Sequence, residues 1–213
     1  NLPGNGEITK RAVIGMARLM SPEIADWIET TIAFPNSMID CITPTTGDRE
    51  RDMVVDRFGV IDAGVVVCEP FRQWVIEDNF PEGRPALEAV GVEFVEDVAS
   101  HELMKLRILN GGHAAIAYPS ALLGLTFSHD AMNSSLIRGF LDKLEAQEII
   151  PTVPPVPGVE FEQYFELTKE RFANAEIGDT IQRLCFDGSN RQPKFIFPTI
   201  LERIKDGLSI SGL

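Results

Sequence analysis

The segment from residue 102 to residue 113, Glu-Leu-Met-Lys-Leu-Arg-Ile-Leu-Asn-Gly-Gly-His, constrains the fold and the chemistry of this chain more than any other. It places polar groups in an otherwise apolar run that is typical of a buried helix. Four of these groups project within roughly 140° of one another at about 100° per residue. They are Glu102, Lys105, Asn110 and His113. Because a buried lysine needs a partner or a purpose, and burial lowers its pKa, the segment predicts Lys105 as a base.

Composition limits the classes of partner. The chain has 213 residues, with 19 Lys and Arg against 32 Asp and Glu, so its net charge is −13. This charge disfavours nucleic acid and anionic membrane surfaces as partners. The three cysteines are far apart, which argues against a disulfide framework and a cysteine zinc site and favours a reducing, cytoplasmic location.

Apolar spacing and capping signals predict a mainly α fold with a small β element. We expect helices at 7–20, from 22 to a stop at Phe34, and at 48–57, 133–147, 160–173 and 198–205. Another helix is expected from residue 100 to an end or a kink at Tyr118-Pro119. Short β-prone runs lie at 65–68, 73–77 and 92–95. Residues 183–194 mix Gly, Ser, Asn and Pro with charge and predict a loop. The chain starts in a loop-like stretch and stops without a clear terminal element, so we expect one domain, 1–213, that is incomplete at both ends.

Two familiar site motifs fail in this sequence. Gly4-Asn-Gly6 resembles the start of a dinucleotide-binding fingerprint, but the third glycine and a preceding strand are missing. His101-Glu102-Leu-Met-Lys105 has lysine where a zinc-protease helix needs its second histidine. The sequence therefore favours a metal-free mechanism, and any nicotinamide cofactor would bind outside this chain.

Each polar residue also has a simpler interpretation. Lys105 could reach solvent or pair with Glu102, Asn110-Gly111 could form a turn, and His113 could be a satisfied core residue. Asp40 could cap a turn or contact a substrate, while Arg183 and Arg191 read as surface charges. The coincidence of a lysine, an asparagine and a histidine on one helical face weakens the three simpler readings of that helix together.

Several segments resemble the mannitol 2-dehydrogenase family of polyol-specific long-chain dehydrogenases. The resemblance covers essentially the whole chain and is carried by Met104-Lys105, Leu109-Asn110-Gly-Gly-His113, Asn1-Leu-Pro-Gly-Asn-Gly6, Phe34-Pro-Asn-Ser-Met-Ile-Asp40, Val67-Cys-Glu-Pro-Phe71, Pro154-Pro-Val-Pro-Gly158 and Asp187-Gly-Ser189 with Pro193-Lys-Phe195. It implies the helical C-terminal substrate domain of a dehydrogenase whose Rossmann domain is not in this chain.

The resemblance also implies a role for each site residue. Lys105 would be the base that takes the proton of the substrate hydroxyl, and Asn110 and Asn1 would hold the substrate oxygen. His113 would orient the substrate, and Glu102 would gate a proton path from the lysine to water. Asp40 and Arg183 would contact sugar hydroxyls. Arg191 stands where family members often carry lysine, which is a departure from the family pattern.

The implied function is an NAD(P)-dependent, metal-independent polyol dehydrogenase that interconverts mannitol-like polyols and ketoses such as fructose. It implies a polyol or ketose substrate and the Rossmann domain of the parent protein as partners, and an isolated fragment without activity. Oxidation is expected to rise with pH and to be insensitive to chelators. One alternative is a hexuronate reductase of the same family, acting on fructuronate and mannonate, with Arg191 facing the substrate carboxylate. An alternative of another class is a non-catalytic helical binding module.

Overall fold

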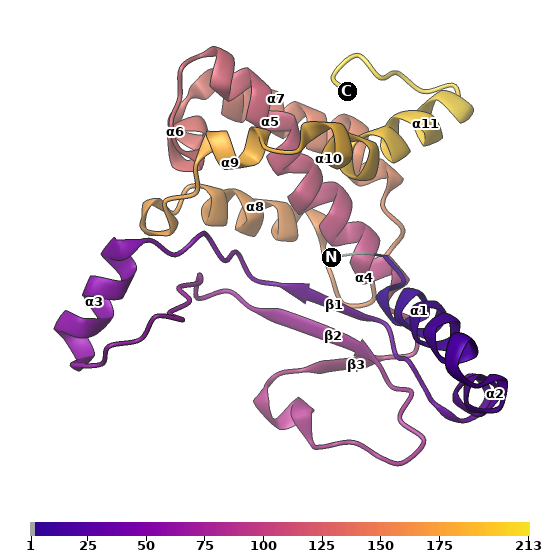
Figure 1. Cartoon of the computed structure of the whole chain (residues 1–213). Coiled ribbons are helices and arrows are strands. Elements are labelled where there is room, and N and C mark those ends of the chain that lie inside the picture. Colours follow the sequence, from indigo (N-terminus) through magenta and orange to yellow (C-terminus); the bar gives the residue numbers. More distant parts are fainter. Residues whose placement is uncertain (1–2) are drawn as a thin grey trace. The chain divides into compact units, whose positions relative to one another are not determined.

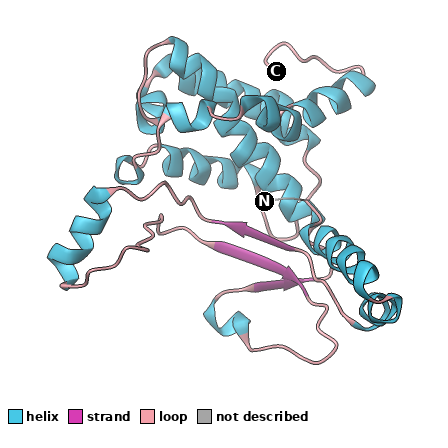
Figure 2. Ribbon diagram, in the orientation of Figure 1, coloured by secondary structure: helices cyan, strands magenta, loops and turns pink. Residues whose placement is uncertain are grey.

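The computed structural model describes residues 3–213, which form two compact units (Figures 1 and 2). The first unit contains residues up to 40 together with 72–103, and the second contains 41–71 together with 104–213. The chain therefore crosses from one unit to the other three times. Each unit has a hydrophobic core of its own.

The first unit begins with two helices, α1 (Asn5–Met20) and α2 (Pro22–Thr31), which pack against each other. Ser21 separates them, and its side-chain oxygen accepts a hydrogen bond from the backbone N–H of Ile24. Pro22 occupies the first helical turn, where its missing N–H costs nothing, and Glu23 complements the positive end of the helix dipole. These local signals confirm the two helices expected from the sequence.

A three-stranded sheet completes the first unit, in the order β1-β2-β3. β1 (Ser37–Asp40) runs antiparallel to β2 (Gln73–Glu77), and β2 runs parallel to β3 (Glu93–Val95). Met38 and Val75 are register partners and form a small core with Val98. The sequence predicted β2 and β3, but it missed β1, which exists through its pairing with β2. No strand forms at residues 65–68, where one was expected.

The apolar stripes of α1 and α2 are largely exposed, although the spacing of Ile24, Trp27, Ile28 and Ile32 predicts a buried stripe on α2. Met16, Met20, Ile24 and Trp27 are all exposed, Trp27 at 56%. Within α2 only Ala25 is fully buried. The apolar spacing therefore predicted the helices correctly, but no described residues of this unit cover the apolar faces of α1 and α2.

A close approach of the chain makes Gly6 a position where no larger residue fits. A Cβ at residue 6 would lie 2.3 Å from the carbonyl oxygen of Phe34 and 2.7 Å from that of Pro35. Backbone atoms cannot rotate away as a side chain can, so Gly6→Ala should destabilise this unit by several kcal/mol, roughly 2–4. Thermal unfolding of the parent protein measures the effect. Gly15→Ala on the same helix, where a Cβ meets nothing within 4 Å, is the control and is expected to be neutral or stabilising.

The second unit is helical. Its helices are α3 (Asp48–Phe58), the last residue of α4 (Ala99–Met104), α5 (Gly111–Leu122), α6 (Ser128–Asn133), α7 (Ser135–Leu144), α8 (Phe161–Phe172), α9 (Ile181–Cys185), α10 (Gly188–Phe195) and α11 (Phe197–Lys205). α5 contacts α7, α9 and α10, so it is the central element of the unit. Short 3-10 turns lie at Leu87–Val90 in the first unit and at Ile150–Thr152 and Ala175–Ile177 in the second.

Two π-helical segments interrupt the helices of the second unit. Lys105–Asn110 joins α4 to α5, and Glu145–Ile149 follows α7 directly. The two segments contact each other. π segments are rare and occur frequently at functional sites, so both segments are candidates for positioning functional side chains.

Two boundaries differ from the sequence expectations. Residues 183–194 belong mostly to α9 and α10 rather than to a loop, because Thr180 caps α9 by accepting from the Arg183 N–H at 3.2 Å and Asp187 takes a left-handed conformation before α10. Helix α5 also continues through Pro119 to Leu122, so of the two alternatives expected there, an end or a kink, the end is excluded. Among the described residues, no helix combines the length and apolar character that crossing a membrane requires.

Candidate active site

The π segment aligns Lys105 with Asn110. In a π-helix the hydrogen bonds join residues five apart, so residues i and i+5 lie nearly one above the other. In a regular α-helix the same pair would be about 140° apart, the widest separation among the four polar residues of this stretch. Both residues are half-buried, and the four residues between them are buried. The assumption of a regular α-helix was therefore wrong, and the π turn brings the two side chains closer to a common face than that assumption allowed.

His113 lies three residues further along, in the first turn of α5, and is buried. Its imidazole stacks on the Phe172 ring, with centroids 3.8 Å apart and planes 15° apart. Its Nε2 is 3.8 Å from a carboxylate oxygen of Asp179. Burial, followed by the positive charges of Arg183, Arg191, Arg171 and Lys105, holds the pKa of His113 well below its usual range. The ring is therefore neutral at pH 7 and can donate or accept one hydrogen bond at each nitrogen.

The lowered pKa of His113 predicts a loss of stability in acid. The unfolded chain takes up a proton near pH 6.5 while the folded chain does not, so stability falls as pH drops below about 6.5. The slope is at most about 1.4 kcal/mol per pH unit. Urea unfolding of the parent protein and a His113→Asn variant, from pH 5 to pH 7.5, measures it. Equal slopes in the two proteins would contradict the prediction.

Asp179 fixes Arg183. The Nε of Arg183 donates to Asp179 at 2.5 Å, and a second guanidinium nitrogen donates to the other carboxylate oxygen. Asp179 is buried, and its own carbonyl accepts from the Ser128 N–H at 2.8 Å. The carboxylate thus holds the Arg183 guanidinium and lies near His113 Nε2, which has no hydrogen-bond partner among the described residues.

Arg191 adds a second guanidinium to this region. It is half-buried, and its Nε has no hydrogen-bond partner among residues 3–213. Burial first, then the positive charge of Arg183, lowers its pKa. Arg191 is therefore more than a surface charge, whereas the side chain of Arg183 is 39% exposed and is held by Asp179. The second unit surrounds a neutral histidine with cationic side chains.

Glu102 belongs to the first unit. It is buried, and its Oε2 accepts a hydrogen bond from the Gly4 N–H at 3.2 Å. Burial is the main cause of its raised pKa, and the Gly4 hydrogen bond opposes it. Glu102 lines a cavity of about 460 Å³ together with Glu7, Asn36, Glu77 and Asp97. A carboxyl with a raised pKa beside a polar cavity has the properties that a proton-transfer group requires.

Asp40 ends β1 and is buried. It faces Gln73 in the register of the sheet. The structure thus places Asp40 and Glu102 in one unit and Lys105, Asn110, His113, Arg183 and Arg191 in the other. Asn1 lies outside the described residues, so its predicted role stays a prediction.

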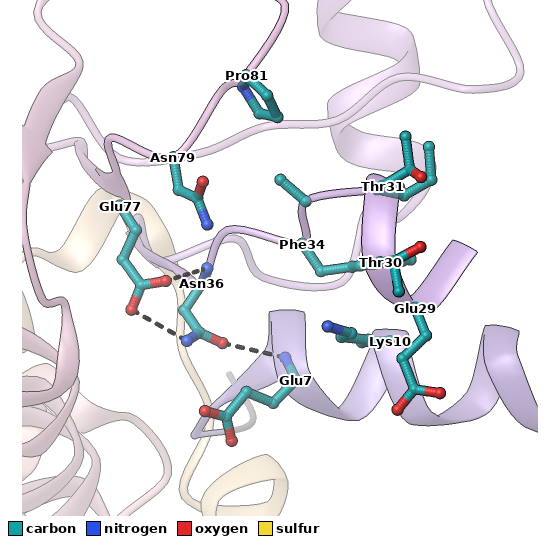
Figure 3. A pocket seen from close by; sticks show the side chains of 12 residues that line it. Glu7, Lys10, Glu29, Thr30, Thr31, Phe34, Asn36, Glu77, Asn79 and Pro81 are labelled. Atoms are coloured by element: carbon teal, nitrogen blue, oxygen red, sulfur yellow. Dashed lines mark hydrogen bonds between the residues drawn. The ribbon is translucent and has the colours of Figure 1, made fainter. Parts of the chain in front are cut away.

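The loop at Gly4-Asn-Gly6 is occupied by contacts within the protein. Asn36 Oδ1 accepts from the N–H groups of Gly6 at 2.8 Å and Glu7 at 3.3 Å, and the Asn36 backbone and amide nitrogens donate to Glu77 (Figure 3). The first N–H groups of α1 therefore hold a side chain, which explains why this loop is no phosphate cradle. Glu7, Asn36 and Glu77 also line a neighbouring pocket of about 400 Å³, which includes Lys10 and Glu29.

Sequence reasoning missed three residues that shape this site. Asp179 could have been found as the acidic partner of Arg183 four residues on, a spacing that favours ion pairs on helices. Phe172 and Glu145 have no local signal, because their importance comes from contacts across the fold. Among residues 3–213, no cluster of three or more His, Cys, Asp or Glu side chains has an arrangement suited to a metal ion.

Comparison with known families assigns the chain. The family model described as the mannitol dehydrogenase C-terminal domain matches residues 97–213. The chain belongs to the mannitol dehydrogenase family. A second model, the mannitol dehydrogenase Rossmann domain, matches residues 1–89.

Curated relatives in this family align with nearly the whole chain. A mannitol 2-dehydrogenase of Cereibacter sphaeroides is 55% identical over 213 residues, which are 100% of this chain and 44% of the relative. Mannitol dehydrogenase 2 of Saccharomyces cerevisiae is 47% identical over 206 residues, 96% of this chain and 41% of that protein. The chain thus spans less than half the length of these relatives.

Solved structures give the same assignment. The ternary complex of Pseudomonas fluorescens mannitol 2-dehydrogenase with NAD and D-mannitol is similar with a TM-score of 0.89 at 43% identity, covering 100% of this chain and 43% of that one. A substrate-free D-sorbitol dehydrogenase is similar with a TM-score of 0.92 at 36% identity, and the match covers 100% of this chain and 44% of that one. The mannitol dehydrogenase assignment therefore holds in sequence and in fold.

The Rossmann match corrects one expectation. We expected the Rossmann domain to be absent, yet residues 1–89 match its family model. The reason for the error is physical, since this stretch contains α1, α2 and two antiparallel strands instead of a strand, glycine-rich turn and helix. The glycine fingerprint that marks a Rossmann domain is absent from it. The mainly α character with a small sheet was predicted correctly.

Proposed function

We propose that the parent protein is an NAD-dependent polyol dehydrogenase that interconverts mannitol-like polyols and their ketoses without a metal. The observation that carries the proposal is the π segment, which turns Lys105 and Asn110 toward one face next to a neutral His113. A base, an amide donor and an imidazole are what oxidation of a secondary alcohol requires. Membership of the mannitol dehydrogenase family supports the substrate class.

Each side chain then has a defined task. Lys105 removes the hydroxyl proton from the substrate, and the Asn110 amide, with Asn1, donates to the oxygen as negative charge develops there. The neutral His113 ring holds a neighbouring hydroxyl in place. Glu102 passes the proton on to water. Asp40, Arg183 and Arg191 contact the remaining hydroxyls, with Arg183 held by Asp179.

This set of side chains contains no group that can accept a hydride. A nicotinamide cofactor would supply that acceptor, which fits a structural relative whose complex contains NAD. The chain's own residues provide the base, the oxygen contacts and the orientation of the substrate. The remaining Rossmann domain of the parent protein, as partner of this chain, would hold the dinucleotide.

The test is a substrate panel with the full-length parent protein. NADH formation is followed at pH 9 with mannitol, sorbitol, arabinitol and mannonate, with NADP tried in parallel and EDTA as a separate addition. Turnover of mannitol that is unaffected by EDTA and rises from pH 6 to pH 9 is expected. Inactivity on every polyol, or loss of activity with EDTA, would count against the proposal.

A second candidate is a hexuronate reductase. The cationic surroundings of His113, with the unpartnered Nε of Arg191, suit a substrate that carries a carboxylate. Activity on mannonate without activity on mannitol would favour this candidate. Arg191→Lys would then raise the KM for mannonate, because lysine lacks the bidentate fork of arginine.

A further inference from the structure

Glu145 is a buried acid to which the proposed mechanism gives no task. Its side chain is 0% exposed, and neither carboxyl oxygen has a hydrogen-bond partner among the described residues. It is the first residue of the π segment that follows α7. Burial alone raises the pKa of Glu145 well above its usual range, so the group is a neutral carboxylic acid at pH 7. A buried group of this kind is costly to keep and calls for an explanation.

Gly112 opens the space that Glu145 occupies. A Cβ at residue 112 would lie 3.3 Å from Glu145 Oε1, 3.4 Å from Phe172 Cε2 and 3.6 Å from Leu141 Cδ1. The glycine is therefore a notch in α5 that three side chains approach at once. Since Oε1 and the Phe172 ring lie within van der Waals reach of one point, they are neighbours across that notch. Glycine inside a helix costs about 1 kcal/mol relative to alanine, and this notch is a reason to keep it.

The notch connects Glu145 to the predicted site. The Phe172 ring that closes one side of the notch is the ring on which the His113 imidazole stacks, at 3.8 Å between centroids. His113 directly follows Gly112 in α5. A shift of the Phe172 ring into the notch would remove the surface that holds the imidazole plane.

We propose that Glu145 is a positioning residue, a neutral acid that fills the Gly112 notch and thereby keeps the Phe172 ring stacked on His113. This proposal builds on the proposed function, in which His113 orients the substrate. The acid acts through shape and not through charge, because no cationic side chain of residues 3–213 is its partner. A glutamine has nearly the same shape and cannot ionise, whereas an alanine leaves the notch empty.

The test compares Glu145→Gln and Glu145→Ala in the full-length parent protein. Without any substrate, the His113 ring protons are observed by NMR in histidine-labelled protein and assigned through their loss in His113→Asn. Stacking on Phe172 shifts them by ring current, so Glu145→Ala should remove this shift and Glu145→Gln should keep it. In steady-state assays with mannitol, Glu145→Ala should lower kcat/KM by about ten- to hundredfold, and Glu145→Gln by less than about threefold.

A double variant tests the notch itself. The methyl group added by Gly112→Ala would lie 3.3 Å from the carboxyl in the wild type and push it aside slightly, but it has room once Glu145→Ala has removed that carboxyl. The kcat/KM loss of Gly112→Ala with Glu145→Ala should therefore be about tenfold smaller than the product of the two single losses. Ile137→Ala, a 2% exposed residue of α7 that does not border the notch, is the matched control for truncation. It should lower the melting temperature without moving the His113 signals.

Three outcomes would overturn the proposal. The first is a His113 spectrum that stays unchanged in Glu145→Ala. The second is a glutamine variant as impaired as the alanine variant, which would assign the role to the proton of Glu145. The third is strict additivity of the two single losses. If Glu145→Ala does not fold, the spectrum of Gly112→Ala decides, since the added methyl lies 3.3 Å from Glu145 Oε1, which is close enough to shift the carboxyl and, through it, the Phe172 ring. The NMR result does not depend on turnover, so it stands even if no polyol proves to be a substrate.

Discussion

Replacing Lys105 by alanine in the parent protein is expected to lower kcat for mannitol oxidation by about 10²–10⁴, the usual contribution of a general base. The reason is that no other amine is aligned with Asn110 by the π segment. The measurement is NADH formation under saturating mannitol from pH 6 to pH 10. The pH dependence of the residual rate should differ from that of the wild type, because the group that takes the proton is gone.

Two further experiments test whether the loss of activity comes from the missing base. Lys143→Ala, which removes an exposed lysine of α7, should leave kcat unchanged. A small primary amine added to the Lys105→Ala protein should restore part of the rate, since it can take the place of the missing amino group. Full activity in Lys105→Ala would remove lysine from the mechanism and favour another base. Equal inactivity of variant and wild type on all substrates would favour a binding module.

The second large effect is expected from the buried ion pair between Glu69 and Arg171. Their side chains are 2% and 4% exposed, and Arg171 donates to both Glu69 oxygens at 2.7–3.1 Å. Glu69 also accepts from the Ile42 N–H at 2.5 Å. Glu69→Leu should destabilise the protein by about 3–5 kcal/mol, because a buried guanidinium loses its counter-charge. Thermal unfolding should show a melting temperature roughly 6–20 °C lower.

The double variant Glu69→Leu with Arg171→Leu distinguishes a charge effect from a packing effect. With both charges removed, the double variant should be more stable than either single variant, since neither charge remains buried alone. Arg51→Ala breaks the exposed pair with Asp48 in the same unit and should change stability by less than about 1 kcal/mol. A double variant as unstable as the sum of the two single variants would show that packing, and not charge, holds this contact.

Local signals in the sequence predicted much of this fold correctly. Ser21, Pro22 and Glu23 define the start of α2 through contacts within a few residues, and the apolar spacing of 160–173 corresponds to α8. Features that depend on distant partners were not predictable in this way. Strand β1 needs β2, and Glu69 meets Arg171 across 102 positions of the sequence. The exposed stripe of α1 and α2 shows that periodicity predicts which side of a helix is apolar, but not whether something covers it.

In the candidate site too, the sequence predicted the residues of the local motif but not the residues that contact them from distant parts of the chain. The motif around Lys105, Asn110 and His113 is local, so the sequence could nominate these residues together. The π turn that rotates Lys105 toward Asn110 leaves no recognisable pattern in the residue types. Asp179, Phe172 and Glu145 act on His113 or beside it from other elements, and only three-dimensional contacts identify them.

The π segment at Lys105–Asn110 has a consequence for how this protein can be improved. A π turn contains one residue more than an α turn, so deleting one residue between Lys105 and Asn110 would yield a more regular helix. In that α-helix the two residues would be four apart, about 40° from each other, and would stay on one face. Such a deletion is therefore a route to a more regular and more stable helix that does not turn the lysine away from the asparagine.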